Sequence, residues 1–111
     1  MEEKISKWIL NGRFPKDLNE VERRAYGVFT YRRNKPIDDT DAVVLLPVLK
    51  QRYKNKFVKV MLESMSSYDD WFFTIGLMED GADDYHWIES EKQPTIAQAI
   101  TAAMMKLIES I

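Results

Sequence analysis

The amino-acid sequence predicts an α+β fold in which helices pack on a small antiparallel sheet of about three strands. Residues 57–63 and 85–89 alternate along the chain with the period of two that is typical of strands. Residues 71–78 are apolar on both faces of a strand, which predicts a central position in the sheet. Segments at both ends repeat apolar residues at helical spacing. With 111 residues and 45% hydrophobic content, residues 1–111 are expected to form one domain.

Two helices are expected first. Residues 4–10 carry apolar side chains at helical spacing, and the following Asn-Gly pair supplies a left-handed stop. Residues 17–33 favour a helix capped by Asp17. The alternative for residues 26–31 is a strand, because this stretch is rich in aromatic and branched residues and tertiary pairing overrides weak helical propensity.

A third helix is expected from residue 38 to about residue 53. The acidic run 38–41 offers several caps for its start. Pro47 lies inside it and removes one backbone hydrogen bond, which predicts a kink near residues 43–46 or a helix in two pieces. Either outcome leaves four apolar residues in the core: Val44, Leu45, Val48 and Leu49.

The remaining elements are a hairpin and a last helix. Residues 79–84 contain an Asp-Gly turn signal, so the second and third strands are expected to be antiparallel neighbours. Thr95 and Gln98 form a capping box, after which a helix runs to the chain end. Its buried stripe is expected to comprise Ile96, Ala99, Ile100, Ala103, Leu107 and Ile111.

Residues 38–110 follow a particular order: an acidic-capped helix, a strand, an aromatic hairpin, and the run Pro94-Thr95-Ile96-Ala97-Gln98-Ala99-Ile100-Thr101-Ala102-Ala103. In this order the chain resembles the phage ABA sandwich domain family, whose members place a small antiparallel sheet between helices and end in an alanine-rich helix. Most members are phage-encoded and have no assigned activity. A cysteine often found in that last helix is absent here. The resemblance implies a phage or prophage origin and an αβα sandwich-like layering, but no mechanism.

Few side chains suit catalysis or metal binding. The chain has no cysteine, which excludes thiolate sites and disulfides, and its single histidine, His86, is expected to be structural or solvent-exposed. The four glycines do not cluster into a phosphate loop or a dinucleotide fingerprint. The carboxylates of residues 79–84 depart from the spacing of a calcium loop. We therefore expect no enzyme, no catalytic residue, no cofactor and no metal site.

Charge is sorted along the chain. Residues 1–60 carry 14 Lys and Arg against 8 Asp and Glu, whereas residues 61–111 carry 2 against 10, within a total of −2. Such segregation indicates recognition of other macromolecules through charged faces. We expect the two ends of the chain to form opposite electrical poles.

The acidic pole is expected around the hairpin, because residues 79–91 contain several carboxylate side chains and no arginine or lysine. Carboxylates on a stiff hairpin steer association with a basic cleft, and neighbouring aromatic side chains supply binding hot spots when one face is uncovered. The alternative is a solvated run that only confers solubility. The predicted partner-binding residues are Glu79, Asp80, Asp83, Asp84, Tyr85, Trp87 and Glu89.

The basic pole includes a second candidate surface, residues 23–35, where arginines surround three aromatic residues. Guanidinium groups neutralise phosphates and aromatic faces stack on bases, so this segment supports nucleic-acid binding. The alternative is a solvated helix face with its aromatic residues in the core. The candidate nucleic-acid-binding residues are Arg23, Arg24, Arg32, Arg33 and Lys35.

From these observations we expect a small phage-type accessory protein that acts without catalysis. It is expected to bind and block a host or defence protein with a basic surface, as an anti-CRISPR-like inhibitor does, an analogy of size and expected origin. A nucleic-acid-binding regulator is the alternative. The N-terminus has no secretion-signal pattern, and the longest apolar run, residues 42–49, is far below the roughly 20 residues that a membrane helix needs. We expect no membrane partner and a cytoplasmic location, that of the host cell if the protein is phage-encoded.

Overall fold

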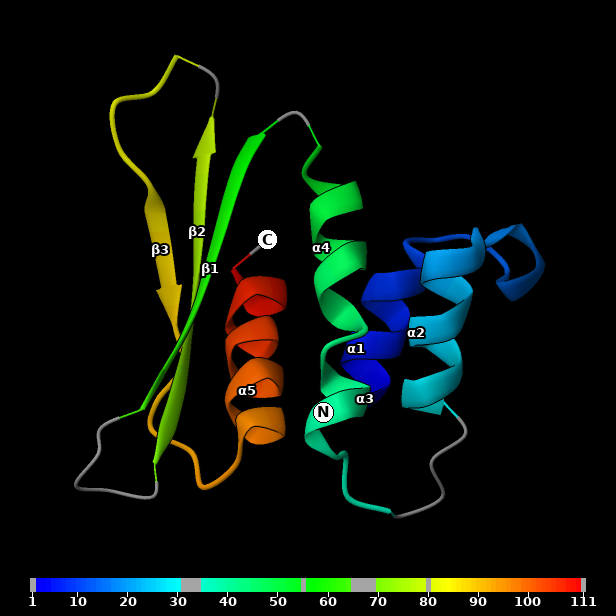
Figure 1. Cartoon of the computed structure of the whole chain (residues 1–111). Helices are drawn as coiled ribbons and strands as arrows, with labels where there is room; N and C mark the ends of the chain where they lie inside the picture. Colours follow the sequence, from blue (N-terminus) through cyan, green and yellow to red (C-terminus); the bar gives the residue numbers. More distant parts are fainter. Residues whose placement is uncertain (1, 31–34, 55, 65–69, 80, 111) are drawn as a thin grey trace.

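Figure 1 shows a computed structural model of the chain, in which residues 2–30, 35–54, 56–64, 70–79 and 81–110 are described. These residues form helices and a three-stranded antiparallel sheet, which confirms the predicted α+β class. The elements follow in the order α1 (Glu2–Leu10), the 3-10 turn η1 (Pro15–Asp17), α2 (Glu20–Thr30), α3 (Asp39–Ala42), α4 (Leu45–Arg52), β1 (Lys56–Ser64), β2 (Trp71–Glu79), β3 (His86–Glu89) and α5 (Ile96–Glu109).

The sheet has the strand order β1-β2-β3, and both neighbouring pairs are antiparallel. The predicted central position of the second strand and the predicted hairpin of the last two strands are therefore confirmed. Ile75, at the middle of β2, lies opposite Val60 on one side and Ile88 on the other. Ile75 is fully buried because its face of the sheet packs against α5.

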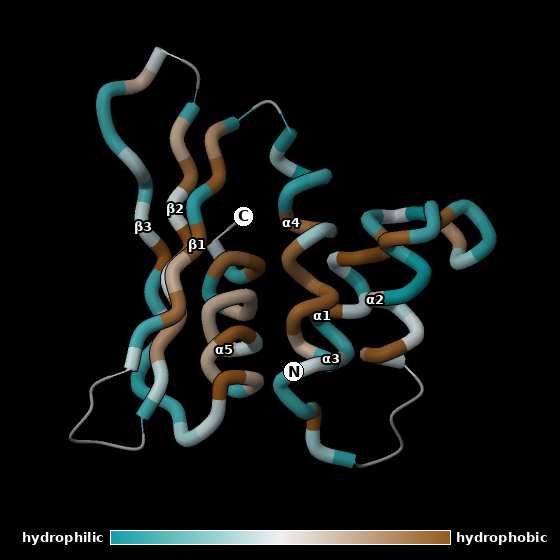
Figure 2. The backbone as a smooth tube through the Cα atoms, viewed as in Figure 1, coloured by the Kyte–Doolittle hydropathy of each residue, from teal (hydrophilic) through white to brown (hydrophobic). Residues whose placement is uncertain are grey.

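All described helices lie on one side of the sheet. α5 packs directly on the sheet, and α1 and α3 pack on the other side of α5 (Figure 1). Figure 2 shows apolar segments concentrated where α5 lies between the sheet and the remaining helices. The layers therefore run from sheet to α5 to the other helices, whereas the family resemblance implies a sheet between helices. No described residue covers the opposite face of the sheet.

The two N-terminal helices form largely where the sequence predicts them. α1 ends at Leu10, and the next two residues adopt positive φ angles of 51° and 78°, as expected for the Asn-Gly stop. The helical interpretation of the second segment is confirmed up to Thr30, and residues 31–33 lie outside the described residues.

The predicted capping role of Asp17 is wrong. Asp17 ends the 3-10 turn, where its carboxylate accepts a hydrogen bond from the Phe14 backbone N–H at 3.4 Å. Asn19 caps α2 instead: its side-chain oxygen accepts from the Glu22 N–H at 2.9 Å, and the Asn19 N–H donates to the Glu22 carboxylate at 3.2 Å. This reciprocal pair is a capping box, which satisfies two N–H groups that a helix start leaves unpaired.

The segment around Pro47 forms two helices, as the proline predicts. Asp38 caps α3 by accepting a hydrogen bond from the Asp41 N–H at 2.8 Å. Pro47 then lies in the first turn of α4, where a missing N–H removes no intrahelical hydrogen bond. Of the four expected core residues, Leu45, Val48 and Leu49 are buried and Val44 is half-buried.

Thr95 caps α5 as predicted, but the Gln98 side-chain oxygen accepts from the Thr95 hydroxyl at 3.2 Å and not from the Thr95 N–H that a capping box would use. The Thr95 hydroxyl accepts from the Gln98 N–H at 3.1 Å. The carboxylate of Asp39 adds a second cap, because it accepts from the Ala97 N–H at 2.8 Å and so ties α3 to the start of α5. The expected stripe is buried at Ala99, Ile100, Ala103 and Leu107, half-buried at Ile96, and outside the described residues at Ile111.

Candidate functional site

The β2–β3 hairpin presents acidic side chains at the end that projects beyond β1 and α4 (Figure 1). Glu79, Asp83, Asp84 and Glu89 are all exposed, and Asp80 lies outside the described residues. Glu79 forms an ion pair with Lys56 of β1 at 3.2 Å. The Asp84 carboxylate accepts a hydrogen bond from the Tyr85 N–H at 2.8 Å, which fixes the backbone just before β3.

Tyr85 and Trp87 lie beside these carboxylates on the face of the sheet that α5 leaves open. Their ring centroids are 5.1 Å apart, and Trp87 is 43% exposed. Trp87 lies against Gly76 of β2, where an added Cβ would meet the Trp87 ring at 2.6 Å. The absence of a side chain at Gly76 therefore lets the indole lie flat on the sheet. An aromatic side chain held in this way and still exposed suits a binding hot spot.

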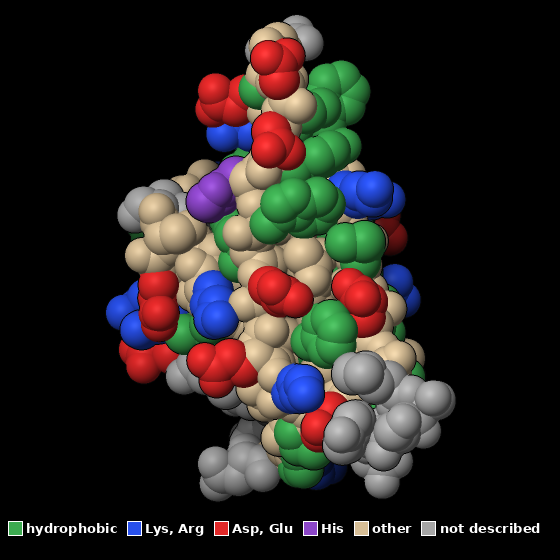
Figure 3. Space-filling model, turned by 90° about the vertical axis from the view of Figure 1, so that its left-hand side faces the viewer, with side chains coloured by type: hydrophobic (Ala, Val, Ile, Leu, Met, Phe, Trp, Pro, Cys, Tyr) green, Lys and Arg blue, Asp and Glu red, His purple; other side chains and the backbone are tan. Residues whose placement is uncertain are grey.

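The open face of the sheet also carries charges of both signs. Figure 3 shows hydrophobic side chains running along this face, acidic side chains gathered toward its upper end, and acidic and basic side chains interspersed lower down. The ion pair between Lys56 and Glu79 and another between Lys4 and Glu109 join the basic half of the sequence to the acidic half. The fold therefore brings part of the two predicted poles together.

The basic segment lies on α2 and the chain after it. Arg23, Arg24 and Lys35 are exposed, and Arg32 and Arg33 lie outside the described residues. Arg23 donates a hydrogen bond to the Leu18 carbonyl at 3.2 Å. Of the aromatic residues, Phe29 is buried in the core and Tyr26 is half-buried, so Phe29 does not offer a ring to a base. Nucleic-acid binding by this segment stays a prediction.

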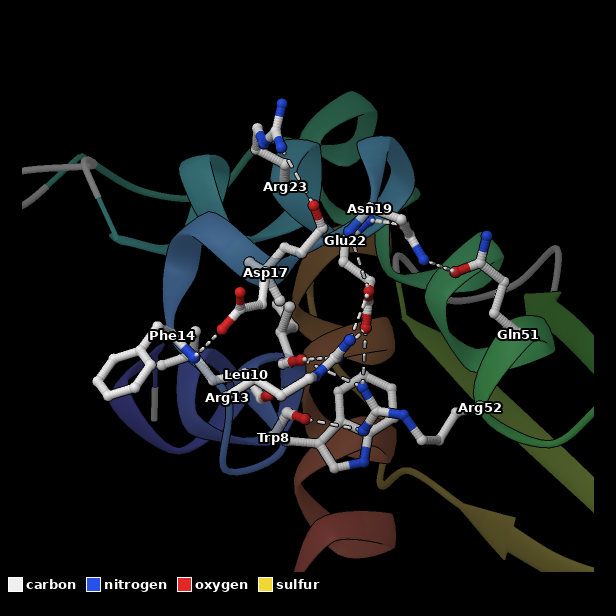
Figure 4. Close-up of polar contacts among 12 residues, drawn as sticks. Trp8, Leu10, Arg13, Phe14, Asp17, Asn19, Glu22, Arg23, Gln51 and Arg52 are labelled. Atoms are coloured by element: carbon white, nitrogen blue, oxygen red, sulfur yellow. Dashed lines mark hydrogen bonds and ion pairs between the residues drawn. The ribbon is translucent and has the colours of Figure 1, made fainter.

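A cluster around Glu22 was not foreseen from the sequence. The buried Glu22 carboxylate pairs with the guanidinium groups of Arg13 and Arg52, the latter at 3.5 Å, and Figure 4 shows both groups converging on it. The hydrogen bond from Arg13 is the main reason that the pKa of Glu22 lies below its usual value, against the opposing effect of burial. The same carboxylate belongs to the capping box of α2.

The two arginines of this cluster also close the end of α1. Arg52 donates to the carbonyls of Trp8 at 2.8 Å and Ile9 at 3.1 Å, and Arg13 donates to Leu10 at 3.0 Å. These carbonyls belong to the last turn of α1. Carbonyls in the last turn of a helix have no backbone N–H partner within that helix. The Arg52 guanidinium also stacks on the Trp8 ring, 4.6 Å from its centroid. The donors are directed at the protein itself, so we assign the cluster a structural role.

The described residues contain no group of three His, Cys, Asp or Glu side chains placed to hold a metal ion. His86 is exposed on β3. Among the described helices, none is long and apolar enough to cross a membrane.

Comparison of the chain with protein-family models, curated proteins and solved structures returns no match. The features that bear on function are therefore those of the molecule itself: the projecting acidic hairpin, the open sheet face and the basic α2 surface.

Proposed function

We propose that this protein acts without catalysis, by binding a protein partner that presents a basic surface to the acidic end of the β2–β3 hairpin. The observation that carries the proposal is the exposure of Asp83 and Asp84 where the hairpin projects from the body of the protein. Glu79 pairs with Lys56, whereas Asp83 and Asp84 at the projecting end have no basic partner among the described residues.

The charge pattern supports recognition of a basic partner. Residues 79–91 contain no Lys or Arg, so nothing within this stretch neutralises its carboxylates. A concentration of one sign of charge at a protruding edge raises the rate of association with an oppositely charged surface and disfavours partners of like charge.

For the identity of the partner, we propose a host or defence protein whose basic surface normally binds nucleic acid. The carboxylates would occupy that surface stoichiometrically, as in an anti-CRISPR-like inhibitor encoded by a phage and acting in the host cytoplasm. The size of the chain, its acidic hairpin and its resemblance to the phage ABA sandwich domain family support this proposal.

Affinity capture from a bacterial lysate, followed by mass spectrometry, tests the proposal. The wild-type chain is compared with the variant Asp83→Lys/Asp84→Lys and with the control Glu20→Lys, which reverses an exposed charge on α2. We expect a basic, nucleic-acid-binding protein to be retained by the wild type and the control and lost from the hairpin variant. Equal retention by all three chains would refute the assignment to the hairpin.

A further inference from the structure

A hollow of about 700 Å³ opens where the end of α1, the start of α2 and the last turn of α4 meet. Of the described residues that line it, four carry cationic side chains, one carries a carboxylate, three carry amides and one is apolar. The carboxylate is that of Glu22, and Figure 4 shows Arg13 and Arg52 directed at it. The other two cations, Lys50 and Lys54, lie on α4 and just after it.

The two lysines are free to bind a ligand. Lys50 and Lys54 are exposed, and neither has a hydrogen-bond or ion-pair partner among the described residues. The Gln51 side-chain oxygen accepts from the Asn19 amide at 3.1 Å, which leaves the NH2 group of Gln51 as a further donor. The two arginines cover the carbonyls that end α1, whose partial negative charge would otherwise repel an anion.

The lining is positive even when the neighbouring carboxylates are considered. Glu22 offsets one of the four cationic groups, which leaves a net charge of +3 on the described lining. The carboxylates of the neighbouring segments lie outside it: Glu3, Asp17, Glu20, Glu79 and Glu109. Glu3, Glu79 and Glu109 each pair with a lysine that is also outside the lining. Asp17 accepts a backbone hydrogen bond, and Glu20 lines a separate hollow between α2 and α3.

The lining indicates a ligand that is recognised by charge and hydrogen bonds. Val48 is its one apolar residue among those described and is 1% exposed, so the hollow lacks the apolar anchor that a protein partner uses. Small ligands are enclosed in mostly apolar pockets, whereas the two lysines here are exposed. Lysine and amide donors are the groups that position proteins on the phosphates of nucleic acids.

We propose that this hollow binds the phosphate backbone of a nucleic acid. Lys50 and Lys54 contact phosphates, the Gln51 amide donates to a phosphate oxygen, and the two arginines add positive potential while they stay bonded to Glu22. No described residue of the lining is aromatic, so bases are not stacked and binding does not depend on sequence. The site is separate from the candidate segment 23–35 and does not require the protein partner of the hairpin.

Fluorescence anisotropy of a labelled oligothymidine, titrated with the full chain at several salt concentrations, tests the proposal. We expect the wild type to bind with a dissociation constant of about 10⁻⁶–10⁻⁴ M, and its affinity to fall as salt rises. Lys50→Gln/Lys54→Gln is expected to lower the slope of log K against log salt by about 1.4, since each phosphate contact on a single strand contributes about 0.7.

The matched control Lys35→Gln/Lys59→Gln removes the same charge from two exposed lysines outside the lining and is expected to keep the wild-type slope. Circular dichroism verifies that each variant is folded. The proposal is overturned by a wild type that does not bind at the lowest salt or by a hollow variant that keeps the wild-type slope. It is also overturned by a control that loses as much slope as the hollow variant.

Competition with polyglutamate separates nucleic acid from negative charge alone. Unlabelled oligothymidine is expected to displace the labelled strand at a lower concentration of charge, because closely spaced phosphates release condensed counterions on binding. Equal or better displacement by polyglutamate would assign the hollow to acidic proteins and overturn the proposal. The hairpin variant Asp83→Lys/Asp84→Lys leaves Lys50 and Lys54 in place, so failure of the hairpin proposal and failure of this one are separate results.

Discussion

At the scale of single residues, Glu22 connects parts of the chain that the sequence around it does not predict to be in contact. It completes the capping box of α2, and it neutralises two guanidinium groups that cap the carbonyls at the end of α1. Asn19 and Glu22 are three residues apart, so the capping box is visible in the sequence. Arg52 is 30 residues from Glu22, and no local signal indicates that the fold brings them together.

Two substitutions of Glu22 distinguish the contribution of its charge to stability from the contribution of its hydrogen bonds. Glu22→Gln keeps a side chain that can complete the capping box, whereas Glu22→Ala loses both the cap and the charge. We expect unfolding free energy to fall by about 1–2 kcal/mol for Gln and about 3 kcal/mol for Ala, since two guanidinium groups lose their counter-charge. Urea unfolding at pH 7 measures both, and equal values for the two variants would contradict the separation.

The stability provided by the Glu22 charge depends on pH. The pKa of Glu22 is lowered in the folded protein, so the charge stabilises the fold fully above the pKa of the unfolded chain, about 4.5. This contribution is lost as the pH falls through the lower pKa of the folded state. The difference in stability between wild type and Glu22→Gln is therefore expected to shrink below about pH 4.5 in urea titrations, and a difference that grows there would contradict the ion pairing.

Gly76 is expected to control the orientation of Trp87. Gly76→Ala places a Cβ within 2.6 Å of the indole, so the ring must shift away from the sheet. Gly27→Ala is the matched control, because its added Cβ meets nothing within 4 Å and alanine favours a helix by about 1 kcal/mol over glycine. We expect tryptophan fluorescence to change in Gly76→Ala and to stay unchanged in Gly27→Ala. The same spectrum in both variants would contradict the contact.

At the scale of elements, the start of α5 is capped twice. Thr95 provides the local cap and Asp39 provides a second one from α3, 58 residues away in the chain. Thr95→Ala and Asp39→Ala are each expected to cost about 1 kcal/mol of unfolding free energy, measured by urea denaturation. Both caps serve the first turn of the same helix, so the double variant is expected to depart from the sum of the single effects. An Asp39→Ala variant as stable as the wild type would show that the bond between α3 and α5 does not contribute.

The sequence predicts well those elements whose start, end or position depends on residues within the element itself. Pro47 divides one helix into α3 and α4, Thr95 starts α5, and the apolar character of residues 71–78 places β2 at the centre of the sheet. The sequence predicts the wrong cap for α2 because Asp and Asn both favour helix starts. In the structure Asp17 belongs to the 3-10 turn Pro15–Asp17 and bonds to the Phe14 N–H, so it does not cap α2.

At the scale of the whole molecule, the layers follow from long-range packing. α5 carries buried residues on more than one side because it lies between the sheet and the other helices, whereas periodicity alone indicates a single stripe. The predicted separation of charge is also modified, since Lys56 of the basic half pairs with Glu79 of the acidic half across neighbouring strands. The acidic hairpin could be predicted because its charges are contiguous in the sequence.

The acidic end of the hairpin is expected to contribute little to folding. Asp83 and Asp84 are exposed and project from the body of the protein, so Asp83→Lys/Asp84→Lys should change unfolding free energy by no more than about 0.5 kcal/mol. Chemical denaturation measures this directly. A larger loss of stability would mean that the carboxylates serve the fold, which would weaken their assignment to partner binding.

Hydrogen exchange of the chain with and without a captured partner tests the central claim most directly. The account predicts slower exchange in residues 79–89 when the partner is bound, and little change in α2. Slower exchange confined to residues 23–35, with the hairpin unaffected, would contradict it and would favour the basic surface as the binding site.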